Sequence, residues 1–258
     1  MVSVHPTAVI EPGAELDADV QIGPYAIVGG NVRVGARVGI GSHTVLEGRV
    51  EIGFDCRIGS HVVIGAPPQD VKYRDEPTRV VIGDRTVVRE FATVHRASIS
   101  GHGVTSVGPD CYLMAYAHVA HDCQLEEGVI MANQATLGGH VEIGRHAIIS
   151  GLTALHQFVR IGEYAFVGGC SGVNQDIPPY VKVHGAPAKP FGLNAVGLRR
   201  HGFSSEAIHS LKEAYRILFL RDLNTSQALE RMEQELLPSA EVRRLIDFVK
   251  RSQRGISK

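Results

Sequence analysis

Histidine and acidic residues in the middle of the chain are the candidates for catalysis, because of their types and their spacing. The string AHVAHDC at residues 117–123 is followed by GGH at 138–140 and HQF at 156–158. A neutral imidazole is the usual general base near pH 7, and a neighbouring carboxylate fixes its tautomer and raises its basicity. A glycine has no Cβ, so its backbone N–H can approach a substrate carbonyl and stabilise an oxyanion. Together the strings predict a base, its carboxylate and an oxyanion donor.

A six-residue repeat runs through most of the chain and predicts how these strings are positioned. An aliphatic residue or Met recurs at every sixth position, often followed by glycine, and a small residue comes four positions later. A helix needs a period of 3.6 and an amphipathic strand a period of two, so neither explains the pattern. Three hexads, each a short strand and a bend, give one turn of a triangular coil. Stacked coils form a parallel β-helix with layers roughly 4.8 Å apart. The repeat positions are Val4, Ile10, Leu16, Ile22, Val28, Val34, Ile40, Leu46, Ile52, Ile58, Ile64, Ile82, Val88, Val94, Val107, Leu113, Val119, Leu125, Met131, Leu137, Ile143, Ile149, Leu155, Ile161, Val167 and Val173.

Residues 18 apart in a regular coil are expected to stack on adjacent layers. His121, Gly139 and Gln157 form one such column, and Asp122 and His140 begin the next. The base and the oxyanion donor would then lie one strand spacing apart, roughly 4.8 Å, which a carbonyl carbon can bridge. The structural alternative for the clustered histidines is a polar contact between subunits. Isolated histidines on other turns are expected to be surface residues, namely His43, His61 and His146.

Two segments interrupt the repeat. Residues 66–81 read APPQDVKYRDEPTRVV, which is too rich in proline and charge for the wall of a coil. Between Val94 and Val107 the spacing is 13 rather than 12, around the string SISGHG. Insertions in a solenoid emerge as loops and often carry binding residues, so both segments are candidate parts of a site.

The overall composition is that of an ordinary globular chain, with 44% hydrophobic and 21% charged residues and a formal net charge of −1. No apolar run is long enough to span a bilayer, and the N-terminus lacks the basic and hydrophobic regions of a secretory signal. The four cysteines show no CxxC pairing, so free buried thiols in a reducing cytosol are expected rather than disulfides. No GxSxG elbow and no Walker or Rossmann fingerprint is present, and no nucleic-acid partner is expected.

Toward the C-terminus the repeat gives way to helical sequence. Ser204, Asn224 and Ser239 are candidate N-caps of three successive helices, and the second begins with a capping-box pattern. We therefore expect a β-helix domain over residues 1–189 and a helical domain over residues 190–258. The second domain holds 12 Lys and Arg against 8 Asp and Glu. This excess predicts either solvated helix faces or a docking face for an acidic partner.

Further strings carry a resemblance to a known family. QDVKY and DEPTR lie in the first interruption, and GGCSGV, HGAPAKPFGLN and RRHGFS follow between residues 168 and 204. With AHVAHDC, GGH and HQF they make the whole chain resemble the hexapeptide-repeat UDP-N-acetylglucosamine 3-O-acyltransferases of Gram-negative bacteria. The resemblance implies a left-handed coil and a cytoplasmic homotrimer with its sites between subunits. It also implies transfer of a 3-hydroxyacyl chain from acyl carrier protein to the 3-hydroxyl of the UDP-sugar, the first step of lipid A synthesis. No metal and no cofactor is implied beyond the phosphopantetheine of the carrier protein.

The same resemblance implies roles for individual residues. His121 is expected to act as general base, Asp122 to orient it, and the Gly139 N–H to hold the tetrahedral oxyanion, with no covalent acyl-enzyme. Gly169 matches the position that limits acyl-chain length, and a glycine there implies room for a longer chain. Substrate-binding positions are matched by Asp70 and Lys72 near the sugar and diphosphate, by Asn194 and Arg200 at the nucleotide, and by His118, His140, His156 and Gln157 in the pocket.

The chain departs from the family pattern at three positions. His201 follows Arg200 where a second arginine is frequent, Val196 stands where some relatives have glutamate, and Pro187 stands where some have histidine. The first two departures concern the nucleotide contacts, and the third concerns the acyl chain. The preferred acyl length stays open, as does the choice between a hydroxyl and an amine at the 3-position of the acceptor sugar.

Other classes compete with this interpretation. The pair His118 and His121 has HxxH spacing, which is compatible with zinc as in the carbonic anhydrases that share the hexapeptide fold, whereas Asp122 and Gly139 suit acyl transfer without a metal. Acetyl-CoA-dependent hexapeptide enzymes leave the DEPTR and C-terminal strings without an explanation. The N-acyltransferase of the same pathway has an N-terminal uridine-binding domain, for which hexads beginning at Val4 leave no room. A non-catalytic or ice-binding solenoid would need regular threonine arrays, which the repeat does not contain.

Overall fold

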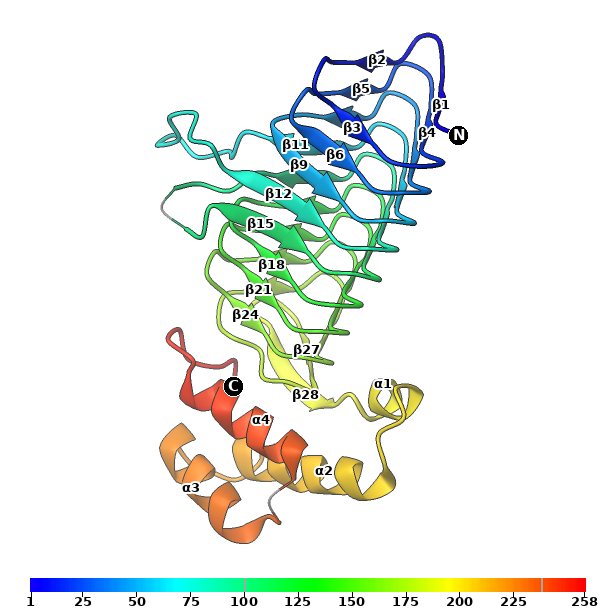
Figure 1. Cartoon of the computed structure of the whole chain (residues 1–258). Coiled ribbons are helices and arrows are strands. Elements are labelled where there is room, and N and C mark those ends of the chain that lie inside the picture. The colour runs from blue at the N-terminus through cyan, green and yellow to red at the C-terminus, as the bar shows by residue number, and fades with distance from the viewer. Residues whose placement is uncertain (100, 238) are drawn as a thin grey trace.

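The chain forms a tall, three-walled coil that ends in a group of helices. The computed structural model describes residues 1–99, 101–237 and 239–258. Figure 1 shows the coils stacked from the N-terminus at one end toward four helices at the other. Each turn of the coil adds one short strand to each of three sheets, and successive strands in a sheet run parallel. The left-handed parallel β-helix expected from the hexads and the family resemblance is confirmed.

The three walls are called the first, second and third sheets, with 11, 9 and 8 strands among the described residues. The first sheet contains β1 Ser3–Val4, β4 Gln21–Ile22, β7 Gly39–Ile40, β10 Arg57–Ile58, β13 Val87–Val88, β16 Tyr112–Leu113, β19 Ile130–Met131, β22 Ile148–Ile149, β25 Phe166–Val167, β27 Val181–His184 and β28 Lys189–Leu193. The second sheet contains β2 Val9–Ile10, β5 Ile27–Val28, β8 Val45–Leu46, β11 Val63–Ala66, β14 Thr93–His95, β17 His118–Val119, β20 Thr136–Leu137, β23 Ala154–Leu155 and β26 Gly172–Val173. The third sheet contains β3 Glu15–Leu16, β6 Val32–Val34, β9 Arg49–Ile52, β12 Arg79–Ile82, β15 Val104–Val107, β18 Gln124–Leu125, β21 Glu142–Ile143 and β24 Arg160–Ile161.

Most coils consist of three hexads, and the two interruptions make two coils longer. Residues 18 apart pair along the regular ladder, as Thr136 does with Ala154. Thr93 pairs instead with Val63 on one side and with His118 on the other, and both partners are more than three hexads away along the chain. Both long coils bulge where the chain passes from the second to the third sheet. We call this edge of the prism the site corner.

The second interruption forms a loop, as expected for an insertion in a solenoid. Val94 and Val107 are 13 residues apart and lie on β14 and β15, which follow each other along the chain. In the described part of the segment from Arg96 to Gly103 there is no strand, so the chain passes directly from β14 to β15. The segment is therefore an excursion at the site corner, and it lengthens the coil that leads from Thr93 to its partner His118.

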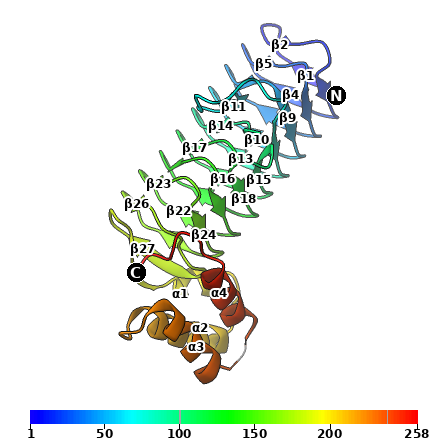
Figure 2. The ribbon, with the colours of Figure 1, turned by 90° about the vertical axis from the view of Figure 1, so that its left-hand side faces the viewer.

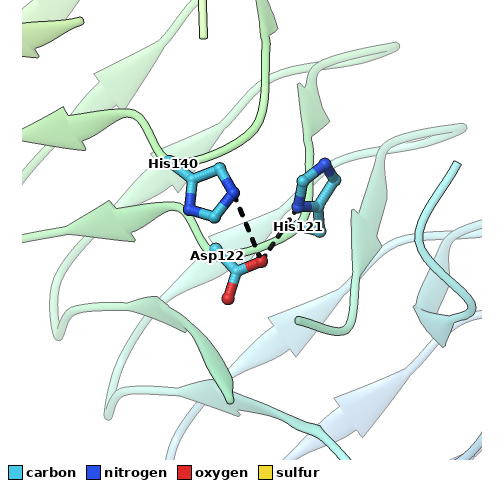
Figure 3. Close-up of side chains that lie close together, drawn as sticks. All are labelled: His121, Asp122 and His140. Atoms are coloured by element: carbon cyan, nitrogen blue, oxygen red, sulfur yellow. Dashed lines mark hydrogen bonds and ion pairs between the residues drawn. The ribbon is translucent and has the colours of Figure 1, made fainter. Parts of the chain in front are cut away.

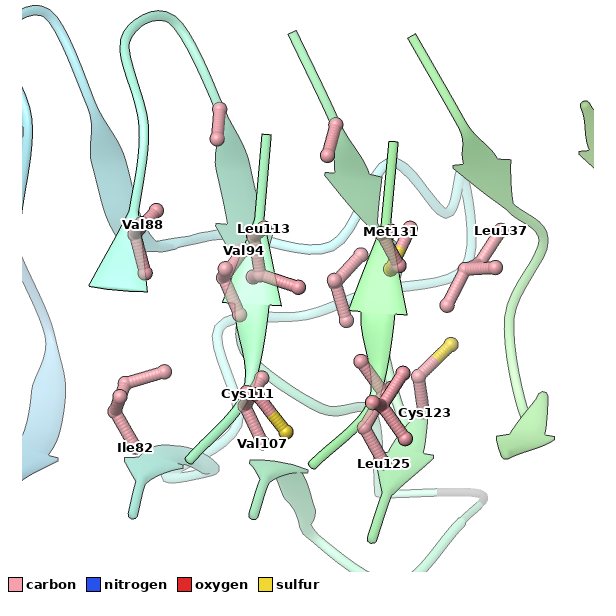
Figure 4. Close-up of a cluster of buried hydrophobic side chains, with 14 of the residues drawn as sticks. Ile82, Val88, Val94, Val107, Cys111, Leu113, Cys123, Leu125, Met131 and Leu137 are labelled. Carbon is pink, nitrogen blue, oxygen red and sulfur yellow. The ribbon is translucent and has the colours of Figure 1, made fainter. Parts of the chain in front are cut away.

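The aliphatic repeat positions point into the coil and form its core. Figure 4 shows Leu113, Met131 and their neighbours converging between the walls, and both side chains are fully buried. The small position near each corner is also buried, because the chain there turns too tightly for a large side chain. Three of the four cysteines, Cys56, Cys111 and Cys123, are buried at this position, and all four are free thiols.

The helices pack on the last coils around a second apolar core. Figure 2 shows the helices lying beyond the last coils, at the end opposite the N-terminus. Ser204, Asn224 and Ser239 cap the three expected helices, with the capping box present at Asn224. A short preceding helix and the antiparallel pairing of β27 with β28 were not expected. The helices are α1 Ala195–Arg200, α2 Ser205–Phe219, α3 Thr225–Glu235 and α4 Ala240–Lys250.

The division of the chain after residue 189 stays a prediction, and the last coil and the C-terminal tail are hydrogen-bonded to each other. Ser252 donates from Oγ to Asp176 Oδ2 at 2.7 Å, and Ser257 donates from Oγ to the Ala188 carbonyl at 2.8 Å. The tail thereby covers the open end of the prism. Within the described residues, no helix combines the length and hydropathy needed to cross a bilayer.

Inward and outward residues of one strand should contribute very differently to stability. In β10, Ile58 points into the core and is 3% exposed, while Arg57 points outward. Ile58→Ala should lower the free energy of unfolding by about 2–5 kcal/mol because it removes buried methyl groups and leaves a cavity. Arg57→Ala should change it by less than about 0.5 kcal/mol. Chemical denaturation of the two variants tests this, and equal losses would contradict the assigned inward register.

Candidate active site

A histidine and a carboxylate from one turn form the centre of the candidate site. The turn after β17 carries His121 and Asp122, and the turn above it carries His140 (Figure 3). His121 Nδ1 lies 2.9 Å from Asp122 Oδ2, a hydrogen-bond distance, and His140 Nε2 lies 3.8 Å from the same oxygen. The Asp122 side chain is fully buried, while the two imidazoles are each about one-sixth exposed, at 16% and 17%. The proton on His121 Nδ1 is thus directed at Asp122, which leaves the Nε2 lone pair for a substrate proton.

The turn geometry explains why these side chains meet. Asp122 and His140 both adopt a left-handed backbone conformation, with φ of 60° and 61°. This conformation costs an L-residue roughly 1–2 kcal/mol, and it is held because the strands on both sides are fixed in their ladders. The His140 N–H donates to the His121 carbonyl at 3.0 Å, so consecutive turns are bonded one above the other. The columns expected from the repeat spacing are therefore present.

Gly139 lies against the imidazole of His121. A Cβ placed on this glycine would be 2.5 Å from His121 Nε2, which is too close for any side chain. Its carbonyl accepts a hydrogen bond from Phe158 at 3.0 Å, whereas its N–H donates none of the hydrogen bonds found among the described residues. The Gly139 N–H is thus available as a donor on a residue that lies against the base, which an oxyanion donor requires. The geometry therefore brings His121, Asp122 and Gly139 together as the sequence predicts.

Asp122 remains charged although it is buried. Its Oδ2 accepts hydrogen bonds from the Ser98 N–H at 2.9 Å and the Ser98 hydroxyl at 2.7 Å, in addition to that from His121. Burial alone would raise the pKa of Asp122, but these hydrogen bonds and the nearby His140 hold it below its ordinary value. Sequence reasoning missed Ser98, which lies in the second interruption.

A second group of polar side chains lies on β14 and β17, beside the central turn. His118 Nδ1 is 2.7 Å from Thr93 Oγ1, and its ring meets that of His95 edge-on at 5.0 Å. Burial lowers the pKa of His118, and so does the nearby His121. His95 was not among the residues singled out in the sequence. Because Thr93 pairs with His118, the nearby His95 also lies beside His118. The regular spacing of the repeat does not predict this register, so His95 could not be placed from the sequence.

The layer above the histidines continues the site. His156 Nδ1 lies 3.0 Å from the Gln157 carbonyl oxygen and 3.3 Å from a guanidinium nitrogen of Arg254 in the C-terminal tail. Phe158 stacks on the His140 ring with centroids 4.4 Å apart. His156 and Gln157 are thus in the predicted neighbourhood. Arg254 is a further residue of this region. The repeat does not predict its position, because the C-terminal tail lies outside the repeat.

The loop of the first interruption extends over the same corner. Lys72 donates from its backbone N–H to Asp70 Oδ1 at 2.9 Å. Burial lowers the pKa of His140, and the charges of Asp122 and Asp70 partly oppose this effect. The loop connects β11 with β12, so it leaves the coil at the same corner as the turn that carries His121 and Asp122. Asp70 and Lys72 are therefore on this side of the prism, and their contact with a substrate stays a prediction.

The atoms of the central cluster also have the composition of a metal site. In the described part of the chain, one group of at least three potential ligands has its atoms within 4.8 Å of one another, and it consists of His121, Asp122 and His140. His118, the other histidine of the HxxH pair considered for zinc, is not part of this group, and its Nδ1 lies 2.7 Å from Thr93 Oγ1. In this cluster His121 and Asp122 lie at hydrogen-bond distance, as an oriented general base requires.

Comparisons with known proteins agree on one family. Two protein families match parts of the chain. The family "Bacterial transferase hexapeptide (six repeats)" matches residues 13–48 and 105–139, and the family "Udp N-acetylglucosamine O-acyltransferase; Domain 2" matches residues 176–257. The acyl-[acyl-carrier-protein]–UDP-N-acetylglucosamine O-acyltransferase of Burkholderia orbicola is 49% identical, covering 99% of both chains. The chain belongs to this family of O-acyltransferases. It is therefore an enzyme of the acyltransferase class.

Solved structures of the acyltransferase family have the same fold over their full length. The UDP-N-acetylglucosamine acyltransferase of Bacteroides fragilis is 37% identical with a TM-score of 0.97, covering 99% of this chain and 100% of that one. The enzyme from Acinetobacter baumannii is 40% identical with a TM-score of 0.96, covering 99% of each chain. The curated relative from Burkholderia mallei is 51% identical over 99% of both chains.

Three positions that resemble acyltransferase substrate contacts lie away from the site corner. The Asn194 side chain caps α1 and donates to the Tyr164 carbonyl at 2.9 Å, at the corner between the third and first sheets. Arg200 ends α1 on the same side. Gly169 lies on the corner between the first and second sheets, where a Cβ would be 3.3 Å from the Gly151 carbonyl oxygen. One chain therefore does not bring these three residues to His121.

Burial of His95 predicts a pH dependence of stability. Burial, together with the charges of His118 and His121, lowers the pKa of His95 from 6.5 to about 4. As the pH falls, His95 becomes protonated near pH 6.5 in the unfolded chain, whereas in the folded chain it stays neutral until about pH 4. The contribution of neutral, buried His95 to the free energy of unfolding is therefore complete above pH 6.5, and it is lost as the pH falls toward 4. His95→Gln should give a shallower fall of melting temperature across this range, and parallel curves for both proteins would contradict it.

Proposed function

We propose that the chain transfers a 3-hydroxyacyl group from acyl carrier protein to the 3-hydroxyl of UDP-N-acetylglucosamine, the first step of lipid A synthesis. The observation that carries the proposal is that His121 contacts both Asp122 on its own turn and Gly139 on the turn stacked above it. The names of the relatives at about 50% identity supply the donor and the acceptor. Acyl transfer needs a base, an oxyanion donor and no further chemical group.

The reaction follows from these three groups. His121 Nε2 takes the proton of the sugar hydroxyl while its oxygen attacks the thioester carbonyl carbon, and the Asp122 carboxylate stabilises the imidazolium. The Gly139 N–H donates to the oxyanion of the tetrahedral intermediate. When the intermediate collapses, the carbon–sulfur bond breaks and the imidazolium returns the proton to the pantetheine thiolate. No covalent acyl-enzyme is formed, and the only prosthetic group is the phosphopantetheine that the carrier protein brings.

Substrate binding is assigned to the residues around this centre. Asp70 and Lys72 would bind the sugar and diphosphate from the loop, and His118, His140, His156 and Gln157 would line the pocket. Asn194 and Arg200 would bind the nucleotide, and Gly169 would limit the acyl chain. Because these last three lie on other corners of the prism, we assign them to a neighbouring copy of the chain in a homotrimer. The outer face available for such a contact is the second sheet, whose described strands contain no Asp, Glu, Lys or Arg.

We assign the binding of the carrier protein to the basic C-terminal region. The reaction is assigned to the cytoplasm. A groove beside the site is lined by Gly101 and Asp122 and also by Arg251 and Arg254. Residues 190–258 hold an excess of Lys and Arg over acidic residues. A phosphopantetheine phosphate and an acidic protein surface both suit guanidinium groups at this place.

Replacement of the proposed base is the direct test of this function. Purified protein is incubated with UDP-N-acetylglucosamine and 3-hydroxyacyl carrier protein, and transfer is measured. His121→Ala should lower kcat by about 10²–10⁴-fold because it removes general-base catalysis, while the variant stays folded. The exposed His43→Ala, in a distant coil, is the matched control and should retain activity.

Two results would overturn the proposal. Unchanged turnover in His121→Ala would remove the assigned base. Stoichiometric zinc in the pure protein, with activity lost to chelators, would favour metal-dependent chemistry at His121, Asp122 and His140.

The proposed acyl-length position gives a second prediction. A side chain at Gly169 has few close neighbours within its own chain, so the protein should still fold. With carrier-protein donors of graded acyl length, Gly169→Met should shift the preference toward shorter chains by filling the space that the end of a long chain occupies. Gly39→Met, at a position with open space in a remote coil, is the control. An unchanged preference in Gly169→Met would contradict the assignment.

A further inference from the structure

The segment of the second interruption replaces a regular turn directly beneath Asp122. In most layers the left-handed residue of each turn donates its N–H to a carbonyl of the layer below, as Phe158 does to Gly139 at 3.0 Å. At Asp122 the N–H donates instead to the Thr105 hydroxyl at 2.8 Å. The Thr105 hydroxyl therefore takes the place of the carbonyl that accepts this hydrogen bond in most other layers.

Ser98 of this segment is bonded to the carboxylate that orients the base. Its N–H and hydroxyl reach Asp122 Oδ2 at 2.9 and 2.7 Å, and His121 Nδ1 reaches the same oxygen at 2.9 Å. Three donors therefore fix one oxygen in position. Ser98 is 4% exposed, so water does not substitute easily for its hydroxyl. Gly101 passes over the other carboxylate oxygen so closely that any side chain there would overlap it.

Arg96 of the same segment holds the loop of the first interruption. Its guanidinium donates to the Tyr73 hydroxyl at 2.8 Å, the Gly65 carbonyl at 2.9 Å and the Asp75 carboxylate at 3.0 Å. The Arg96 side chain is only 11% exposed, so its packing is firm although the Asp75 side chain is open to solvent. The Thr78 hydroxyl also donates to the Ala97 carbonyl. The loop bearing Asp70 and Lys72 is thereby attached two residues away from Ser98.

We propose that Ser98 and Arg96 are positioning residues of the transfer reaction, Ser98 by aiming the Asp122 carboxylate at His121 and Arg96 by fixing the loop that binds the UDP-sugar. The inference rests on the function proposed above. It assigns the second interruption two tasks, one for the chemical step and one for acceptor binding. The two tasks predict different kinetic effects.

Substitution of Ser98 should affect the chemical step. Ser98→Ala should lower kcat about tenfold and leave KM for UDP-N-acetylglucosamine nearly unchanged, because the base loses its fixed partner. The acid limb of kcat/KM should move to higher pH, since loss of one donor makes both the carboxylate and the imidazole beside it easier to protonate. Ser98→Thr, which keeps the hydroxyl, should restore both values. Ser42→Ala, at a hydroxyl in a remote coil, is the matched control.

Substitution of Arg96 should affect acceptor binding. Arg96→Gln should raise KM for UDP-N-acetylglucosamine about tenfold with a smaller change in kcat, because the loop loses the two hydrogen bonds that hold Tyr73 and Asp75. Arg37→Gln, at an exposed arginine that pairs with Asp55 in a distant coil, is the control and should leave both constants unchanged.

The outcomes separate this inference from the proposed function. A wild-type protein without transfer activity would overturn the function itself. An active wild type with an unaltered kcat and acid limb in Ser98→Ala would overturn the role of Ser98 alone, and so would a lowered melting temperature without these kinetic changes. If Ser98→Ala fails to fold, Ser98→Cys keeps the size and weakens the donor. It should show the reduced kcat and the moved acid limb, and wild-type kinetics in that variant would equally overturn the role.

Discussion

The parallel hydrogen-bond ladder between coils is the constraint on which the site depends. It places residues 18 apart over one another, so that Gly139 lies above His121 and His140 above Asp122. A slip of one residue would turn every aliphatic side chain outward and every polar one inward. The apolar core therefore fixes the register, and the register in turn fixes the distance between the base and the oxyanion donor. Stability and catalytic geometry have the same origin in this fold.

A perfectly regular coil could not hold this site. Buried carboxylates need hydrogen-bond donors, and the regular turn presents a carbonyl to the layer above it. The second interruption supplies such donors to Asp122 Oδ2, whereas Asp122 Oδ1 has no hydrogen-bond partner among the described residues. One long coil inserts Ser98 beneath Asp122, and the other carries its charged loop, with Asp70 and Lys72, at the same corner. The irregular segments thus supply the polar environment, while the regular turns supply the precision.

The sequence predicted the parts of the molecule that obey a local or periodic rule. The hexads predict the coil, and the spacing of three hexads predicts the column of His121 and Gly139. The roles of Ser98, Arg96 and His95 could not be predicted, because the spacing rule fails across the two longer coils. Helix caps such as Asn224 are signalled within four residues, so the longer helices were expected. The hairpin of β27 and β28 depends on how the last coil is closed, which no repeat encodes.

The distribution of charge over the three walls argues for how copies of the chain would meet. The outer face of the third sheet carries ion pairs between layers, such as Arg160 with Glu142 at 2.9 Å, which are stable in water. Val9 and Ile27 of the second sheet instead expose aliphatic side chains to solvent. Covering an uncharged wall removes apolar area from water without stranding a charge, whereas covering the third sheet would desolvate its ion pairs. A neighbour on the second sheet would also meet the site corner, which is one edge of that wall. The proposed contact between copies would therefore close the cleft beside His121 with residues that one chain holds on its other corners.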